Sequence, residues 1–158
     1  MVNTTFRLDE PQNEPIRNYA PGSTEAESLA QRVASRGKVT HEIPRIVGGE
    51  REETGELREW HAPHDQGNLL CRWHAATPEV VQRGLDAGRK AWHEWSATPA
   101  HVRASVLLKA ADLLAVPWRD TINASTMLGQ SKTCYQAEID AACELADFWR
   151  FNSYYLLN

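Results

Sequence analysis

The chain has 158 residues, of which 42% are apolar and 24% are charged, and its formal net charge is −4. This composition is typical of a globular protein with one core, and a negative charge gives no electrostatic reason to expect nucleic acid or an anionic membrane as a partner. No apolar run approaches the ~20 residues that are needed to span a bilayer.

Residues 1–22 are polar and contain several prolines, so we expect an extended N-terminal arm. The segment lacks the apolar core of a signal peptide and the acid-poor character of a transit peptide, and a cytoplasmic location is therefore expected. The pattern Thr24-x-x-Glu27 is that of a capping box, and apolar residues follow at helical spacing. It predicts a helix over residues 24–36.

Three short runs predict strands, at residues 43–49, 56–61 and 69–75. The first run contains two glycines, and a cluster of turn residues at 63–67 separates the other two. Two or three strands without a wider sheet are marginally stable alone. We therefore expect β-ribbon elements at the edge of a larger structure.

The chain is predicted to be helical from Thr77 onward. Thr77-Pro-Glu79 combines a cap, a first-turn proline and a first-turn acid. The apolar stripe of this helix comprises Val81, Leu85, Gly88, Trp92 and Trp95. Thr98-Pro99 repeats the start signal for a second helix, which Pro117 ends. Its apolar positions are Val102, Val106, Ala110 and Leu113.

Two further helices are predicted, over residues 119–129 and 137–154, and Gly129 supplies a C-terminal stop for the first of them. One face of the last helix carries Ile139, Ala142, Ala146, Trp149 and Ser153. Gly129-Gln-Ser-Lys132 lacks the full pattern of a phosphate-binding loop, so we interpret it as a helix stop followed by a turn. The sequence thus predicts a mainly helical chain with short β-ribbon strands.

The six histidines show no spacing that is typical of a metal site. His61 and His64 lie near a predicted turn, and His93 and His101 fall in different predicted helices. No Cys/His ligand pattern occurs. We therefore expect scattered surface histidines and no metal centre.

Cys71, Cys134 and Cys143 are odd in number and form no C-x-x-C pattern, which fits free thiols in a reducing compartment. A thiol nucleophile needs a base to activate it, and none of the three has an identifiable base partner. Cys143 lies beside the apolar face of the last helix, where a small buried side chain is the simpler interpretation. We expect catalysis by none of them.

Asp140, Glu144 and Asp147 recur at i, i+4 and i+7, which places three carboxylates on one face of the last predicted helix. Two interpretations remain open. The residues either form a solvated acidic face, partly neutralised by Arg150, or include a functional carboxylate that faces a cavity or a partner.

The segment of residues 122–152 closely resembles the 1-pyrroline-5-carboxylate dehydrogenases, a branch of the aldehyde dehydrogenases. Its block Gln136-Ala-Glu-Ile-Asp-Ala-Ala142 points to this branch. Asn13-Glu-Pro15 is similar to the family's N-terminal arm, and Trp95-Ser-Ala-Thr-Pro99 is similar to a helical pair that aldehyde dehydrogenases share more widely. The resemblance covers nearly the whole chain from about residue 13.

The resemblance implies an aldehyde dehydrogenase-like α/β fold in which residues 23–158 form part of the N-terminal, cofactor-binding domain. A complete member oxidises L-glutamate 5-semialdehyde to glutamate in proline catabolism. In it a cysteine thiolate attacks the aldehyde, hydride passes to NAD, and a glutamate activates water. Such enzymes are expected to be homo-oligomers, in the cytoplasm or in the mitochondrial matrix of eukaryotes.

One site residue follows from the resemblance. Glu144-Leu-Ala-Asp-Phe148 matches a family element whose glutamate lies near the aldehyde pocket, which implies a substrate-proximal role for Glu144. The catalytic cysteine with its G-Q-x-C context, the general-base glutamate and the nicotinamide-binding loops fall beyond Asn158 in relatives. We therefore expect an N-terminal fragment that contains no catalytic, cofactor-binding or metal-binding residue and is inactive alone.

An alternative comes from another class of protein. The chain would then be a non-catalytic helical interaction module, whose exposed aromatic stripe binds a partner such as full-length dehydrogenase subunits. The apolar run at residues 154–157 separates the two hypotheses. If the chain is an interaction module, this run should be protected from solvent only when a partner is bound. If the chain is a fragment, the run should cause aggregation.

Overall fold

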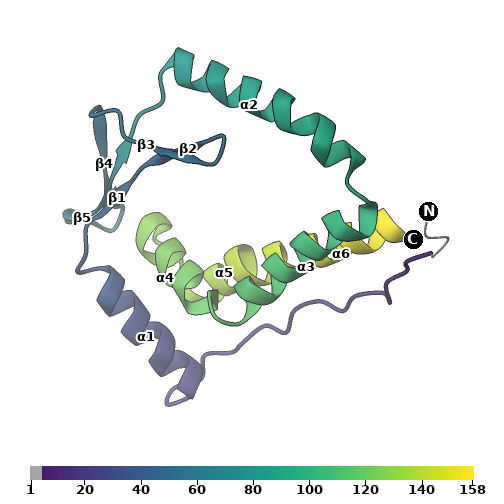
Figure 1. Ribbon diagram of the computed structural model, residues 1–158. Coiled ribbons are helices and arrows are strands. Elements are labelled where there is room, and N and C mark those ends of the chain that lie inside the picture. The colour runs from purple at the N-terminus through teal and green to yellow at the C-terminus, as the bar shows by residue number, and fades with distance from the viewer. Residues whose placement is uncertain (1–4) are drawn as a thin grey trace. The chain divides into compact units, whose positions relative to one another are not determined.

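The computed structural model describes residues 5–158 and consists of two units. The first unit contains an N-terminal arm and a set of helices. This first unit comprises the chain up to Arg36 together with Pro99–Asn158, and Gly37–Thr98 form the second unit. The arm, residues 5–20, contains neither helix nor strand. The first unit's helical elements are α1 (Thr24–Arg36), α3 (Ala100–Ala115), α4 (Arg119–Gln130), α5 (Cys134–Ala137), the π-helical turn η1 (Glu138–Cys143) and α6 (Glu144–Leu157) (Figure 1).

Two helix ends differ from the predicted ones. Ser23 caps α1, because its Oγ accepts a hydrogen bond from the Ala26 N–H at 3.3 Å, so the cap lies one residue before the predicted Thr24. Helix α4 continues through the predicted stop at Gly129 and ends at Gln130, and the residue after it, Ser131, adopts a left-handed φ of 56°. A serine therefore occupies the backbone conformation that favours glycine.

The last helix also begins earlier than the predicted residue 137. Thr133 and Gln136 form a capping box, with 3.3 Å from the Gln136 N–H to Thr133 Oγ1 and 2.9 Å from the Thr133 N–H to Gln136 Oε1. The T-x-x-Q signal that the sequence contains thus starts the helix at Cys134. The helix then runs through η1 without interruption to Leu157.

Helices α3 and α6 lie side by side and form the core of the first unit (Figure 1). The predicted buried face of the last helix is confirmed, since Ala142, Ala146 and Ser153 are each 0% exposed. The predicted face of α3 is wrong. Its buried residues are Ala104, Ala111, Leu114 and Ala115, whereas Val102, Val106 and Leu113 are at least 40% exposed. Small side chains let the two helices approach closely, and the Ser153 hydroxyl lies 3.4 Å from the Ala104 carbonyl oxygen.

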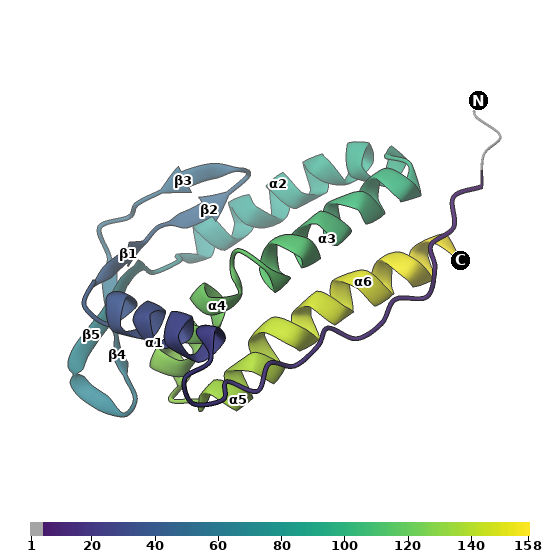
Figure 2. The ribbon, with the colours of Figure 1, turned by 90° about the horizontal axis from the view of Figure 1, so that it is seen from below.

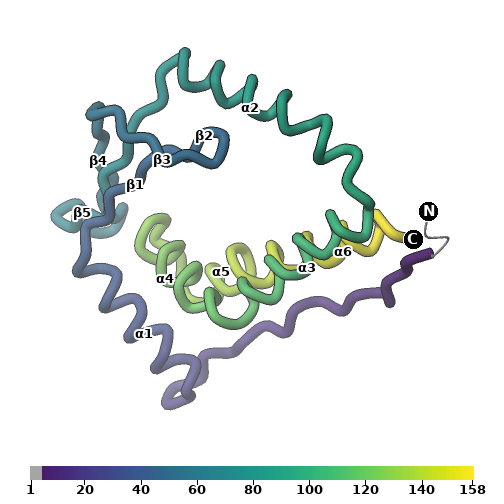
Figure 3. Tube along the Cα trace, in the orientation of Figure 1, coloured from purple at the N-terminus to yellow at the C-terminus, as the bar shows by residue number. Residues whose placement is uncertain are grey.

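The second unit contains a three-stranded sheet with the order β1-β5-β4. Strand β1 (His41–Ile43) pairs parallel to β5 (Asp65–His74), and β4 (Leu57–Ala62) pairs antiparallel to β5 (Figure 3). The predicted turn at 63–67 is shorter than expected, because β5 already begins at Asp65. The hairpin confirms the other two predicted strands.

The predicted strand at 43–49 consists of the end of β1, a short strand and a turn. Strands β2 (Arg45–Val47) and β3 (Glu50–Glu52) form an antiparallel ribbon around Gly48 and Gly49, whose φ values are 60° and 89°. Both φ values disfavour side chains, so the two glycines make the tight reversal possible.

Helix α2 (Pro78–Ala97) starts at the predicted cap, since the Thr77 side chain accepts a hydrogen bond from the Val80 N–H. Its predicted apolar stripe is exposed among the described residues: the exposed fractions are 56% for Val81, 53% for Leu85, 61% for Trp92 and 49% for Trp95. No helix within residues 5–158 is both long and apolar enough to cross a membrane.

Candidate functional site

Glu144 is the first residue of α6, and its carboxylate lies at a surface pocket of about 320 Å³. The pocket is also lined by Ile122, Thr126, Gln130, Lys132, Asp140, Ala141, Leu145 and Phe148. Lys132 pairs with Asp140 at 2.5 Å, which neutralises that carboxylate. The Glu144 side chain makes no hydrogen bond or ion pair with any residue in the described part of the chain. The pocket therefore presents one unpaired carboxylate beside apolar side chains.

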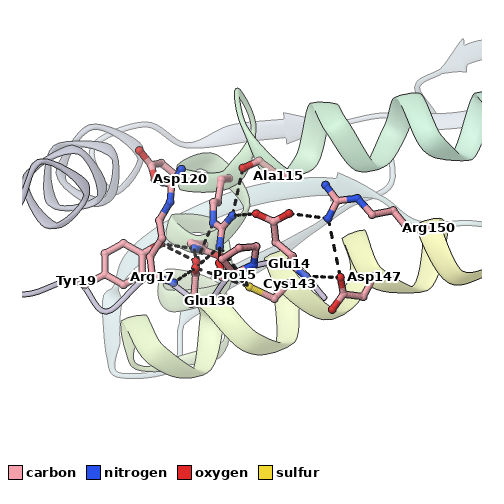
Figure 4. Close-up of polar contacts among 12 residues, drawn as sticks. Glu14, Pro15, Arg17, Tyr19, Ala115, Asp120, Glu138, Cys143, Asp147 and Arg150 are labelled. Carbon is pink, nitrogen blue, oxygen red and sulfur yellow. Dashed lines mark hydrogen bonds and ion pairs between the residues drawn. The ribbon is translucent and has the colours of Figure 1, made fainter. Parts of the chain in front are cut away.

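The other flank of the same helix carries a buried polar cluster, which we call the arm cluster (Figure 4). Its members are Glu14, Pro15, Arg17, Tyr19, Arg119, Asn123, Glu138, Cys143, Asp147 and Arg150. At its centre, Glu138 is 0% exposed and Arg119 is 2% exposed. Two nitrogens of the Arg119 guanidinium donate to the two oxygens of Glu138, Nε to Oε2 at 3.2 Å and Nη2 to Oε1.

The arm supplies further partners to this pair. The Arg17 backbone N–H donates to Glu138 at 2.8 Å and the Tyr19 hydroxyl donates to it at 2.7 Å. Glu14 uses one oxygen to bind Arg119 at 2.5 Å and the other to bind Arg150 at 2.6 Å. The cluster thus fastens residues of the arm to α4, η1 and α6, and the arm runs alongside α6 (Figure 2).

The cluster keeps its charges. Burial alone would raise the pKa of Glu138, but the hydrogen bonds from Arg119 and the other donors outweigh it and lower the pKa to about 2. Burial would lower the pKa of Arg119, yet its bonds to Glu138 and Glu14 raise that pKa. The pKa of Tyr19 is raised, first by burial and then by its bond to Glu138. Near neutral pH, Glu138 and Arg119 therefore form an ion pair, and Tyr19 keeps the proton that its hydroxyl donates.

Cys143 lies inside the cluster, with its Sγ 3.3 Å from Nη2 of Arg119. Burial, followed by the negative charge of Glu138, raises the pKa of its thiol to about 11. A protonated, buried thiol is a poor nucleophile. Burial also raises the pKa of Cys71, and Cys134 is partly exposed.

The three predicted carboxylates do not share one face, so that part of the prediction is wrong. Asp140 and Glu144 line the same pocket, whereas Asp147 accepts hydrogen bonds from Asn13 at 2.8 Å and from the Glu14 N–H at 2.7 Å. The π-turn η1 separates Asp147 from Asp140, because it holds one residue more than an α-turn and rotates the residues after it by about 100° relative to those before it. The predicted partial neutralisation by Arg150 is confirmed, at 4.0 Å from Asp147.

His74 is a buried histidine that the sequence did not single out. Its ligand atoms, with those of Glu42 and Glu53, lie within 4.8 Å of one another. However, Nδ1 accepts a hydrogen bond from the Thr54 N–H at 3.0 Å, so the neutral ring carries its proton on Nε2 and points it at Glu42, 3.1 Å away. Neither ring nitrogen has a free lone pair, and the group does not fit a divalent cation.

The other predicted candidates have ordinary surroundings. His61 lies 3.5 Å from Glu59, and the ring of His101 stacks on Phe6 with centroids 4.0 Å apart. Helix α4 does end within residues 129–132, but it ends at Gln130, and the left-handed residue is Ser131.

The chain is similar to known proteins over most of its length. Residues 50–156 match the aldehyde dehydrogenase family. The chain belongs to this family. It is 40% identical over 153 residues to the Delta-1-pyrroline-5-carboxylate dehydrogenase of Agaricus bisporus, which covers 96% of this chain and 28% of that relative. It is also 40% identical over 141 residues to the mitochondrial enzyme of that name from Bos taurus, covering 89% of this chain and 25% of the relative.

Solved structures of aldehyde dehydrogenases are also similar to this chain in fold. The Delta-pyrroline-5-carboxylate dehydrogenase of Mycobacterium tuberculosis is 42% identical, with a TM-score of 0.93 over 97% of this chain and 29% of that one. The same enzyme bound with NAD gives a TM-score of 0.92. These matches confirm the predicted fold class and the resemblance to this branch. The chain spans less than a third of the length of each of these relatives.

The arm cluster as a unit does not follow from the sequence patterns, although the sequence contains two signals for it. Both central carboxylates lie in family-like blocks, Glu14 in Asn13-Glu-Pro15 and Glu138 in Gln136-Ala-Glu. A buried charged residue needs a partner, and the sequence pattern indicates Arg119 only as the start of a helix. The substrate-proximal role of Glu144 and the division at residue 22 stay predictions.

Proposed function

We propose that this chain is the N-terminal part of an NAD-dependent dehydrogenase that oxidises L-glutamate 5-semialdehyde, the open form of 1-pyrroline-5-carboxylate, to glutamate in proline catabolism. The observation that carries the proposal is the 42% identity, with a TM-score of 0.92, to a Delta-pyrroline-5-carboxylate dehydrogenase bound with NAD. Residues 23–158 would then be part of the cofactor-binding domain. The whole protein would be a homo-oligomer, in the cytoplasm or in the mitochondrial matrix of a eukaryote.

NAD supplies the hydride acceptor in this reaction. The sequence contains no G-x-G-x-x-G loop, no phosphate-binding loop and no G-Q-x-C element. We therefore assign neither the cofactor nor the nucleophile to residues of this chain. The contribution of this chain is instead a carboxylate, Glu144, at the aldehyde pocket.

The chemistry of the Glu144 pocket fits such a role. A semialdehyde with an amino acid end has a cationic ammonium group beside an anionic carboxylate and a short aliphatic stem, and the ammonium group is the part that a protein carboxylate attracts. Glu144 offers an unpaired anion, while Leu145 and Phe148 offer apolar contact in the same pocket. A carboxylate that protein groups have not already neutralised retains its full charge for a ligand.

The test is NAD reduction by the native gene product that carries this sequence, with L-glutamate 5-semialdehyde as substrate. We expect the whole polypeptide to form NADH and the separate 158-residue chain to form none. Absence of turnover by the whole polypeptide would refute the proposed reaction. Turnover by the 158-residue chain would refute the proposal that the nucleophile and the cofactor site are not part of this chain.

The role of Glu144 has its own test in the same protein. Glu144→Gln keeps the shape of the side chain and removes its charge, and we expect kcat/KM for the aldehyde to fall by about tenfold. Glu94→Gln, the same change at an exposed position of α2, serves as the control. Equal kcat/KM for the two variants would remove Glu144 from the aldehyde site.

The interaction-module alternative is favoured by one observation, the exposed stripe of α2 with Trp92 at 61% and Trp95 at 49%. Contiguous exposed apolar residues mark interaction surfaces. The same exposure is expected of a segment that is covered by other parts of a larger enzyme. A stable native product with the mass of this chain and no dehydrogenase activity would favour the module.

A further inference from the structure

The helix that carries Glu144 contains one irregular turn, directly before that residue. From Glu138 to Cys143 the backbone is π-helical, and the Glu144 N–H donates to the carbonyl oxygen of Ile139, five residues back. An α-helix would direct this bond to residue 140. Single π-turns inside α-helices are uncommon and occur often at functional sites.

The extra residue of the turn decides which side chains face the arm. In an unbroken α-helix, at about 100° per residue, Asp147 and Arg150 would lie roughly 120–180° around the helix from Glu138. The π-turn removes about 100° of that separation. As a result Glu138, Asp147 and Arg150 all reach the arm, as their bonds to Arg17, Asn13 and Glu14 record. The same rotation sets the direction of Glu144.

Glu138 is held more firmly than any other residue of the turn. Its two oxygens accept from the Arg17 N–H at 2.8 Å, the Tyr19 hydroxyl at 2.7 Å, Asn123 Nδ2 at 2.8 Å and two nitrogens of Arg119. A fully buried carboxylate with this many donors has one position. Because Glu138 is the first residue of η1, it fixes the start of the turn.

We propose that Glu138, together with the Tyr19 hydroxyl that binds it, is a positioning residue that holds the π-turn and thereby aims Glu144 into its pocket. This inference rests on the proposed function, in which Glu144 acts at the aldehyde site. Glu138 itself is sealed from the pocket and touches no substrate. It acts through six residues of helix.

Tyr19→Phe is the variant of choice, because it removes one donor from Glu138 and leaves the buried ion pair with Arg119 in place. The matched control is Tyr135→Phe, the same change on α5 at a side chain that is 56% exposed. In the native gene product we expect Tyr19→Phe to lower kcat/KM for the aldehyde by about tenfold, since small misplacements of a site residue have effects of this size or more. The KM for NAD should not change, and Tyr135→Phe should behave as wild type.

A double variant separates positioning from simple loss of structure. If Tyr19 acts through Glu144, then adding Tyr19→Phe to Glu144→Gln should cause no further loss of kcat/KM, because the group being aimed has already lost its charge. Losses that multiply in the double variant, in step with a lower melting temperature, would overturn the inference and leave Tyr19 a structural residue only.

Hydrogen exchange of the backbone in residues 139–147 supplies a readout that does not depend on activity. We expect the Glu144 amide to exchange faster in Tyr19→Phe than in wild type or Tyr135→Phe, because its bond to Ile139 loses support. If the wild-type protein fails to reduce NAD, the proposed function is wrong and the exchange alone decides the inference. Unchanged exchange at Glu144 would then overturn it.

Discussion

Arg119 and Glu138 form a bidentate ion pair in which neither side chain is more than 2% exposed. The pair joins α4 to the π-turn, and Glu14 adds a second carboxylate on the other side of the guanidinium at 2.5 Å. Desolvation of such charges is unfavourable, and a buried pair is stable only when additional hydrogen bonds satisfy both groups. The arm provides those bonds, so the arm and the pair depend on each other.

We expect Glu138→Gln to lower the free energy of unfolding by about 3 kcal/mol, because it leaves a buried guanidinium without its principal counter-charge. Urea unfolding of the chain measures the change. Asp140→Asn, which breaks the more exposed pair with Lys132, is the control and should cost less than about 1 kcal/mol. Similar losses of unfolding free energy in the two variants would contradict the larger contribution that we assign to the buried ion pair.

Acid should unfold the first unit partly through Glu138. Its pKa is about 2 in the folded chain, against 4.5 for the free side chain, so the folded state binds this proton less tightly than the unfolded state. The stabilisation is therefore complete above pH 4.5 and is lost as the pH falls toward 2. The unfolding free energy of wild type, measured from neutral pH down through this window, should fall more steeply than that of Glu138→Gln. Parallel curves would argue against a depressed pKa.

Thiol reagents should distinguish the cysteines. Cys143 is 4% exposed and burial raises its pKa to about 11, so we expect it to be alkylated last in the native chain, after the partly exposed Cys134. Peptide mapping after timed alkylation gives the order, and all three sites should react alike in urea. Early modification of Cys143 without denaturant would mean that the arm opens readily.

Ser131→Gly should stabilise the chain by about 1 kcal/mol, since a left-handed φ is unfavourable for residues with a Cβ atom. Ser125→Gly, the same change inside α4, should have the opposite sign with a loss of about 0.5 kcal/mol. Thermal unfolding of the two variants beside wild type provides the measurement. A loss in both would show that the Ser131 side chain contributes more than its backbone conformation costs.

Much of the helical part could be predicted from periodicity and caps, and the predicted face of Ala142, Ala146 and Ser153 is the buried one. The face of α3 could not, because Val102 and Val106 are more apolar than the alanines that are buried. Close helix packing selects small side chains over apolar ones at that contact. Intrinsic hydrophobicity contains no information on this choice.

The periodicity of the sequence does not indicate the π-turn, which rotates Asp147 away from Asp140. The bonds that hold it come from far along the chain: the Arg17 N–H and Glu138 are 121 positions apart, and Asn13 and Asp147 are 134 apart. The periodicity of a short sequence segment gives no information on hydrogen bonds between residues this far apart. The family-like blocks around Glu14 and Glu138 were the available clue, and they locate the residues without giving their contacts.

The contacts of the arm with distant residues affect the order in which the chain folds during its synthesis on the ribosome. Glu14 is synthesised early, yet its partners Arg119 and Arg150 follow 105 and 136 positions later. The second unit, Gly37–Thr98, is complete in sequence before either arginine has been made. We therefore expect the arm to stay unbound, and accessible to proteases and chaperones, until α4 and α6 have been synthesised.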